Sequence, residues 1–293
     1  MIIVICGPTG VGKTKLSIEL AKKYNAEIIN ADSMQTYIGM NIATAKIKDN
    51  ERDGVFHHLF DINDPKDMYT IYDYQRDARS KIEEISANNK NIIFVGGSGL
   101  YIKSALYDLE FSAEDEKKDY SYLSVEDIIN KLSTYTNISN VDINNRRRLE
   151  RLLEKYENGS VIGKNSNNKL YDFICIGLTT DRDNLYNIIN NRVDKMISEG
   201  LVQEARSFYD KNIHSKAIQT CIGYKELYKY FNGKCSLEES IDLIKKNSRH
   251  YAKRQYTYFK HQMDVTWFDV NYDDFSKTIL DVENYIVKEK KNN

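Results

Sequence analysis

The run IIVIC, residues 2–6, leads directly into GPTGVGKT, residues 7–14, and this stretch decides the fold. Five apolar and mostly β-branched residues in a row are typical of a strand buried on both faces of a parallel sheet. The next eight residues match GxxxxGK[ST] and precede a helical pattern, the context in which backbone N–H groups converge on phosphate oxygens. Lys13 adds a positive charge there, and the Thr14 hydroxyl can ligate Mg²⁺. The sequence therefore predicts a phosphate-binding loop.

The rest of the chain alternates between strand and helix patterns. Short apolar runs at 27–31, 92–95 and 172–178 predict further buried strands, and the spacing of apolar residues at 72–87 predicts a helix between the first two. The C-terminal third has mostly helical patterns, with a strand expected at 265–270. This order predicts an α/β fold: a P-loop NTPase-like parallel sheet flanked by helices, with a helical C-terminal region.

The segment 109–168 differs in character from its surroundings. It has an acidic opening, short helical patterns and then the polar stretch NGSVIGKNSNNK. The acidic residues of its opening are Glu110, Glu114, Asp115 and Glu116. We interpret it as a small inserted helical lobe, with 1–108 and 169–293 forming the catalytic core.

Composition excludes several classes of protein. The 293 residues carry 42 Lys and Arg against 43 Asp and Glu, so the net charge of -1 gives no global argument for a nucleic-acid partner. The four cysteines form no CxxC pair, so neither a zinc site nor a disulfide framework is indicated. No apolar stretch approaches the roughly 18 residues of a membrane helix, and the N-terminal run is too short for a signal peptide. We expect a cytoplasmic, monomeric protein without a membrane segment.

The strand at 92–95 lacks the carboxylate that P-loop kinases and NTPases usually place after a neighbouring strand to organise the metal ion. Gly96, Gly97 and Ser98 follow it instead. Two glycines and a small hydroxyl indicate a close approach of the backbone to a ligand, and a tight turn is the alternative.

Asp32 and Ser33 follow the strand predicted at 27–31. Both should therefore lie at the carboxyl edge of the sheet near the phosphate-binding loop, where open α/β folds bind ligands. Asp32 is a candidate general base. Its alternative roles are a helix cap or a second shell around a metal ion.

Arg192 falls on the apolar face of a helix predicted from about 183 to 198. A guanidinium on such a face needs an anionic partner, because burying it unpaired is costly. Diphosphate would satisfy it, and a structural salt bridge is the alternative.

Two basic segments could contact nucleic acid. Arginines cluster at 146–151, and the segment 245–261 holds six Lys or Arg and no acid. On a helix, one stripe comprises Lys246, Arg249, Lys253 and Lys260, which suits contacts to a phosphate backbone. A solvated basic face is the alternative.

With these residues in place, the chain resembles the tRNA dimethylallyltransferase (tRNA isopentenyltransferase) family over nearly its whole length. The resemblance rests on motifs that occur in order: GPTGVGKT (7–14), ADSMQTYIGMNIATAK (31–46), HHLFD (57–61), FVGGSGLY (94–101), CIGYKE (221–226) and AKRQYTYFK (252–260). The family transfers a dimethylallyl group from dimethylallyl diphosphate to N6 of adenosine 37 of tRNAs that read codons beginning with U, with Mg²⁺. The resemblance implies that the loop holds the leaving diphosphate rather than ATP.

The resemblance also implies roles for individual residues. Asp32 would take the N6 proton, Arg192 would neutralise leaving-group charge, and Thr9 joins them as catalytic. The diphosphate-binding residues would be Gly7, Pro8, Thr9, Gly10, Val11, Gly12, Lys13 and Thr14, with Thr14 also at the metal. The tRNA-binding side would comprise Asp32, Ser33, Met34, Gln35, Ser98, Arg147, Arg148, Arg151, Gln219, Gly223, Tyr224, Lys225, Lys253, Arg254 and Gln255. The base would enter a channel from the side opposite the small substrate.

The chain departs from the family pattern at Ala43, where a glycine is usual, and in a shortened insert. Two rival functions remain at this point. A P-loop small-molecule kinase leaves the GGS, CIGYKE and AKRQ segments without a role, and a non-catalytic RNA-binding protein leaves Asp32 and Arg192 without one.

Overall fold

The computed structural model describes residues 1–111, 118–159 and 165–292. They form two compact units, one of Met1–Leu106 with Leu170–Asn293 and one of Tyr107–Lys169. The insert expected at 109–168 thus corresponds to a unit that begins two residues earlier and ends one residue later. Glu114, Asp115 and Glu116 of its acidic opening lie outside the described residues.

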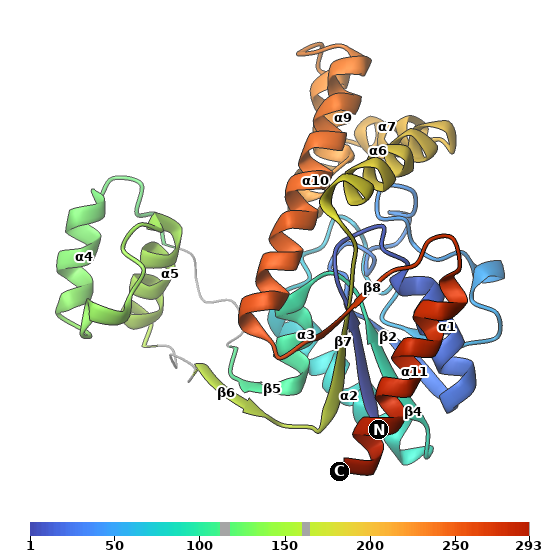
Figure 1. Cartoon of the computed structure of the whole chain (residues 1–293). Helices are drawn as coiled ribbons and strands as arrows, with labels where there is room; N and C mark the ends of the chain where they lie inside the picture. Colours follow the sequence, from blue (N-terminus) through green and yellow to red (C-terminus); the bar gives the residue numbers. More distant parts are fainter. Residues whose placement is uncertain (112–117, 160–164, 293) are drawn as a thin grey trace. The chain divides into compact units, whose positions relative to one another are not determined.

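A six-stranded parallel sheet forms the centre of the larger unit (Figure 1). Across the sheet the strands are β3 (His57–His58), β2 (Ala26–Asn30), β4 (Asn91–Val95), β1 (Ile2–Cys6), β7 (Phe173–Thr179) and β8 (Thr266–Asp269). All five residues of β1 are buried between β4 and β7. The prediction of a parallel sheet around IIVIC is confirmed.

Helices cover both faces of the sheet because one crossover between strands runs toward one edge of the sheet and another runs toward the opposite edge. The crossover from β1 to β2 runs one way and that from β3 to β4 the other, and right-handed crossovers of opposite direction place their helices on opposite faces. One face carries α1 (Lys13–Tyr24) and α11 (Phe275–Asn292), and the other carries α2 (Ile71–Ala87) and α3 (Gly99–Leu106). The core under α1 and α11 includes Ile3, Ile5, Leu16, Leu20, Val282 and Ile286.

The C-terminal region of the larger unit is helical, as predicted. It consists of α6 (Arg182–Ser198), α7 (Leu201–Asp210), α8 (Lys216–Thr220), α9 (Tyr224–Phe231) and α10 (Leu237–Gln262). Ser236 begins α10 by accepting a hydrogen bond from the Glu239 N–H, in a capping box. A short 3₁₀ turn, η1 (Asp49–Glu51), precedes β3. In the described ranges, no helix combines the length and apolar character needed to cross a membrane.

The smaller unit contains an antiparallel strand pair and its own hydrophobic core. Its elements are β5 (Tyr107–Leu109), α4 (Val125–Ser133), η2 (Ile138–Asn140), α5 (Arg146–Glu157) and β6 (Asn165–Lys169). The buried core residues are Tyr120, Ile128, Leu132, Leu149 and Leu153. The apolar faces of α4 and α5 therefore pack against each other.

Because the smaller unit has its own core, we expect a mutation in that core to destabilise the smaller unit and not the central sheet. We expect Leu149→Ala to destabilise the smaller unit by about 2–5 kcal/mol, because Leu149 is fully buried and leaves a cavity. Hydrogen exchange resolved by peptide should show α4 and α5 losing protection while β1 and β4 keep theirs. Tyr122→Ala, at a side chain that is 72% exposed in the same unit, is the matched control and should change little. Equal loss of protection in the central sheet would contradict this prediction.

Candidate active site

The phosphate-binding loop connects β1 to α1 through glycines that no other residue could replace without strain. Gly7, Gly10 and Gly12 have φ of 133°, 90° and 95°, in the left-handed region. Gly12 is the N-cap residue that directly precedes α1, so the loop ends at the positive end of that helix. Val11, also predicted to bind diphosphate, is fully buried, and its side chain packs in the core under α1.

Lys13 is folded back over the loop. Its Nζ donates to the carbonyl oxygens of Gly7 at 3.0 Å and Pro8 at 2.7 Å. Burial and the nearby charge of Arg192 together lower the pKa of Lys13 to about 8, and the charge of Asp32 opposes this shift. An anion in the loop would remove the charge repulsion that Lys13 now experiences.

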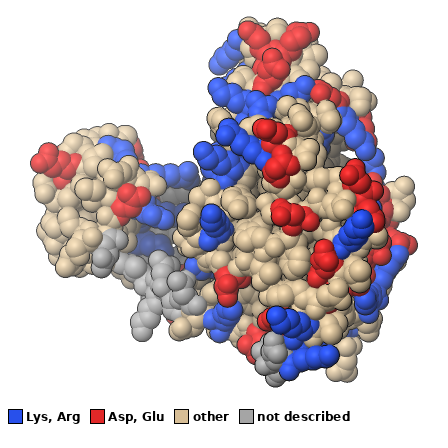
Figure 2. All heavy atoms as spheres, in the orientation of Figure 1, with Lys and Arg blue, Asp and Glu red and all other residues tan. Residues whose placement is uncertain are grey.

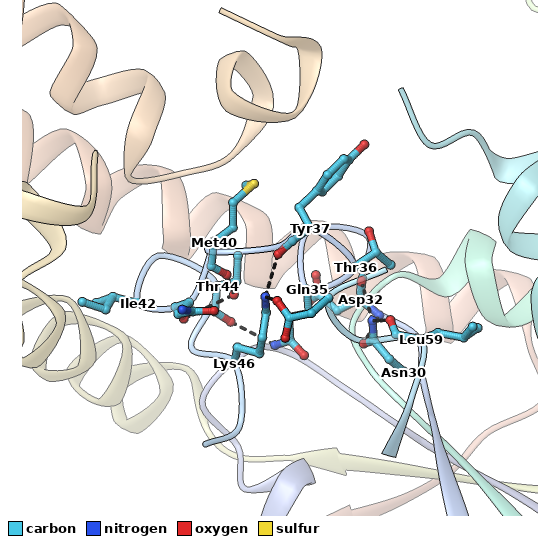
Figure 3. A network of polar contacts seen from close by, with 12 residues as sticks. Asn30, Asp32, Gln35, Thr36, Tyr37, Met40, Ile42, Thr44, Lys46 and Leu59 are labelled. Carbon is cyan, nitrogen blue, oxygen red and sulfur yellow. Dashed lines mark hydrogen bonds and ion pairs between the residues drawn. The ribbon is translucent and has the colours of Figure 1, made fainter. Parts of the chain in front are cut away.

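Asp32 is held at the end of β2 by a short polar turn. The Asp32 N–H donates to Asn30 Oδ1 at 2.9 Å, and the Met34 N–H donates to Asp32 Oδ1 at 3.0 Å. Asn30 Nδ2 completes the turn by donating to the carbonyl oxygens of Asp32 and Leu59 (Figure 3). Burial raises the pKa of Asp32, while the Met34 N–H and the charges of Lys13 and Arg192 oppose the rise. A raised pKa suits a carboxylate that accepts a proton near neutral pH.

Arg192 lies on α6, as predicted, and is half-buried. Within the described part of the chain no carboxylate lies in salt-bridge distance of its guanidinium. Burial lowers the pKa of Arg192 and the charge of Asp32 raises it. The structural salt bridge that was the alternative is therefore not found among those residues.

Two cavities meet at these residues. The first, about 340 Å³, lies over the phosphate-binding loop, and the second, about 200 Å³, lies between the loop after β2 and helices α6 and α10. Thr9, Asp32, Thr44 and Arg192 line both. Apolar side chains of the second cavity are Met34, Ile189, Val193, Met196, Leu201 and Ile244. The three predicted catalytic residues are thus brought together at the border of two cavities.

The glycines of the turn after β4 are needed because other parts of the protein lie close to them, whereas the sequence indicated a close approach to a ligand. A side chain at Gly96 would overlap the backbone of Ala31, and one at Gly97 would overlap the side-chain amide of Gln255. The close approach is therefore to other parts of the protein, although both glycines also line the first cavity. Gln255, predicted to contact tRNA, is buried beneath the loop, where it accepts a hydrogen bond from the Thr9 N–H at 3.0 Å.

The loop that follows Asp32 is fixed by its own polar groups. The Ser33 N–H donates to Ser98 Oγ at 3.1 Å, which ties it to the turn after β4. Gln35 Nε2 donates to the Thr44 carbonyl at 3.0 Å, and Lys46 Nζ donates to the Tyr37 carbonyl at 2.6 Å (Figure 3). The hydrogen bond from Gln35 to Thr44 therefore joins two parts of the loop that follows Asp32.

Glu204 organises the loop after β2, although no motif in the sequence predicted a role for it. Its carboxylate, on α7, accepts hydrogen bonds from the backbone N–H groups of Asn41, Ile42 and Ala43 at 2.8–3.1 Å. The hydroxyl of Tyr224 donates to the same carboxylate at 2.6 Å. Tyr224 is fully buried, so its side chain supports this loop and does not face a ligand, contrary to its predicted place on the tRNA-binding side. Gly223 is buried as well.

The remaining predicted tRNA-binding residues lie on the surface or near it. Lys253 and Arg254 are exposed on α10, and Figure 2 shows Lys and Arg side chains along this helix. Arg254 also lines the second cavity. Gln219 is exposed and Lys225 is half-buried. Arg147, Arg148 and Arg151 are exposed on α5 of the smaller unit.

The donor set at the loop fits a hard divalent cation better than a transition metal. Thr14 is exposed toward the first cavity and offers a hydroxyl oxygen, and Asp32 offers a carboxylate on the same cavity. Across the described ranges no three His, Cys, Asp or Glu side chains cluster as a metal site. Mg²⁺ accepts such a site, because it keeps several waters and binds one or two protein oxygens together with substrate phosphates.

Known proteins match the chain over most of its length. Residues 35–262 match the IPP transferase family. The chain is 44% identical to a tRNA dimethylallyltransferase of Geobacillus kaustophilus, over 97% of this chain and 96% of that one. It is 45% identical to the protein of that name from Bacillus subtilis, over 92% and 90%.

Solved structures agree with the sequence comparison. The crystal structure of a tRNA isopentenylpyrophosphate transferase from Bacillus halodurans aligns with a TM-score of 0.77 at 41% identity, over 99% of this chain and 97% of that one. A eukaryotic dimethylallyltransferase described as acting on tRNA aligns with a TM-score of 0.74 at 28% identity, over 91% and 73%. The chain therefore belongs to the IPP transferase family, and the relatives that it resembles are tRNA dimethylallyltransferases.

Proposed function

We propose that the protein transfers a dimethylallyl group from dimethylallyl diphosphate to the exocyclic N6 of an adenosine in tRNA and releases diphosphate. The observation that carries the proposal is the meeting of two cavities at Asp32, Arg192 and Thr9. One cavity offers the phosphate-binding loop and the other opens beside the basic helix α10. Two substrates of different chemistry can therefore reach one reactive centre from different sides.

The reaction exchanges one bond for another. The lone pair of N6 forms a bond to C1 of the allyl group, and the C1–O bond breaks, with its electron pair leaving on diphosphate. N6 then carries an excess proton, and Asp32 takes it. A carboxylate whose pKa is raised by burial is a better proton acceptor than an exposed one.

The charge that develops on the leaving group is matched by Lys13 and Arg192. Both cations border the first cavity and lack a carboxylate partner within salt-bridge distance in the described ranges. Pre-arranged charges of this kind typically contribute about 3 kcal/mol to lowering a barrier. When bound, Mg²⁺ would add to this neutralisation, and Thr14 would be its ligand from the protein.

The nucleoside would be adenosine 37, next to the anticodon, in tRNAs that read codons beginning with U. Support for this finer assignment comes from the ordered family motifs, and the chemistry requires the base to leave its stack before N6 can reach Asp32. The exposed basic stripe of α10 would bind the phosphate backbone outside the second cavity.

The decisive experiment combines purified protein, Mg²⁺, dimethylallyl diphosphate and unmodified tRNA. We expect mass spectrometry of digested tRNA to show one adenosine that has gained a dimethylallyl group in place of a hydrogen. A transcript with another base in place of adenosine 37 is the control and should stay unmodified. Phosphoryl transfer from ATP to a small acceptor, without tRNA modification, would instead favour a kinase.

Asp32 should be needed for turnover and not for RNA affinity. We expect Asp32→Asn, which keeps the shape and removes the proton acceptor, to lower kcat by roughly 10²–10⁴. Affinity for tRNA should stay within about threefold of wild type, because no cation of the RNA-facing helix changes. Asp210→Asn, an exposed acid at the end of α7, is the matched control. A loss of less than about threefold in kcat would remove Asp32 from the role of base.

The basic face of α10 makes a separate prediction. Lys253→Ala should weaken tRNA binding and reduce the slope of log affinity against log salt by about one. Affinity for diphosphate should not change. Lys288→Ala, at an exposed lysine of the separate helix α11, should leave both the affinity and the slope as they are. An unchanged slope in the Lys253 variant would exclude this residue from the RNA interface.

A further inference from the structure

Gln255 is a polar side chain buried where α10 meets the sheet. Its exposed fraction is 4%. Gln255 Oε1 accepts a hydrogen bond from the Thr9 N–H of the phosphate-binding loop at 3.0 Å, and Gln255 Nε2 donates to the Gly97 carbonyl at 3.2 Å. One amide thus joins three segments that are far apart in the sequence: the loop after β1, the turn after β4, and α10.

The residues around the Gln255 amide leave space for it. Gly97 has no side chain because a Cβ there would overlap Gln255 Nε2. Tyr251, one turn earlier on α10, lies close to the side chains of both Ser98 and Gln255. The position requires a neutral group that accepts on one side and donates on the other, which a carboxylate, an ammonium or an apolar side chain cannot do.

Gln255 is hydrogen-bonded to Thr9 and Gly97, and both of these residues line the cavities of the reactive centre. Thr9 lines both cavities together with Asp32 and Arg192, and Gly97 lines the cavity over the loop. The Thr9 N–H is also a loop donor already bound to the protein, so a bound anion takes its hydrogen bonds from other groups. A shift of the Gln255 amide would move the loop relative to the turn after β4.

We propose that Gln255 is a positioning residue, which acts through Thr9 and Gly97 to hold the phosphate-binding loop in the geometry that binds diphosphate. The proposal rests on the proposed function, because it takes the anion in the loop to be the leaving diphosphate. It replaces the expectation that Gln255 contacts tRNA. Its exposed neighbours on α10, Lys253 and Arg254, serve that side instead.

The test uses the full-length protein and measures binding of inorganic diphosphate with Mg²⁺ by calorimetry. Gln255→Met keeps the approximate volume and removes both hydrogen bonds. We expect diphosphate affinity to fall about tenfold or more, kcat to fall with it, and tRNA affinity to stay within about twofold. Thr257→Ala, at an exposed position of the same helix, should match wild type in all three. Thermal unfolding of each variant checks that it folds.

A second variant separates positioning from a purely structural role. In Gln255→Glu a protonated carboxyl can donate to the Gly97 carbonyl and accept from Thr9, as the amide does, whereas the carboxylate cannot donate. Burial raises the pKa of a carboxyl group above its usual value of about 4.3. Diphosphate affinity relative to wild type at the same pH should therefore recover as the pH is lowered from about 8 to about 5.5.

The outcomes distinguish this inference from the function on which it rests. Wild-type diphosphate affinity and kcat in Gln255→Met, or a loss of tRNA affinity with diphosphate binding intact, would overturn the positioning role. A relative affinity of Gln255→Glu that does not change with pH would also count against it. Wild-type protein that binds diphosphate but modifies no tRNA would contradict the proposed function alone.

Discussion

Two half-buried cations and one carboxylate share the end of the sheet, and the rest of the site depends on how their charges balance. The charge of Arg192 lowers the pKa of Lys13, and Asp32 raises it. Near neutral pH the group carries a net positive charge in a partly desolvated place, which is costly without an anion. A bound diphosphate would remove this cost, and its departure would restore it. The repulsion between Lys13 and Arg192 therefore favours the binding of an anion at this site.

The order of the strands explains why these three residues meet. The chain leaves β1 through α1 to reach β2 on one side, and it later crosses to β7 on the other side. Open α/β sheets bind ligands where the connections diverge in this way. Lys13 begins the helix after β1, Asp32 follows β2, and Arg192 lies on the helix after β7. Each follows the carboxyl end of a strand, so all three can meet at the same edge of the sheet.

The sequence predicted the parts of the structure that depend on local pattern. The strand IIVIC, the glycines of the loop, and the helix that carries Arg192 all follow from spacing over a few residues. Partners distant in the sequence could not be predicted in this way. Glu204 and Asn41 are 163 positions apart, and Gln255 and Gly97 are 158 apart. Periodicity indicates that a side chain points inward, but not which group it meets, and for that reason the buried hydrogen bonds of Tyr224 and Gln255 could not be predicted.

Helix α10 shows how one element can serve both sides of the reactive centre. Successive residues of an α-helix point about 100° apart, so Arg254 can line the second cavity while Gln255 holds the loop under the first. Ala252, Gln255 and Phe259 are buried and fix the rotation of the helix against the larger unit. That same rotation places Lys253 and Arg254 outward. The geometry of the phosphate-binding loop and the direction of the basic face are therefore set by one packing arrangement, and a change of register would disturb both together.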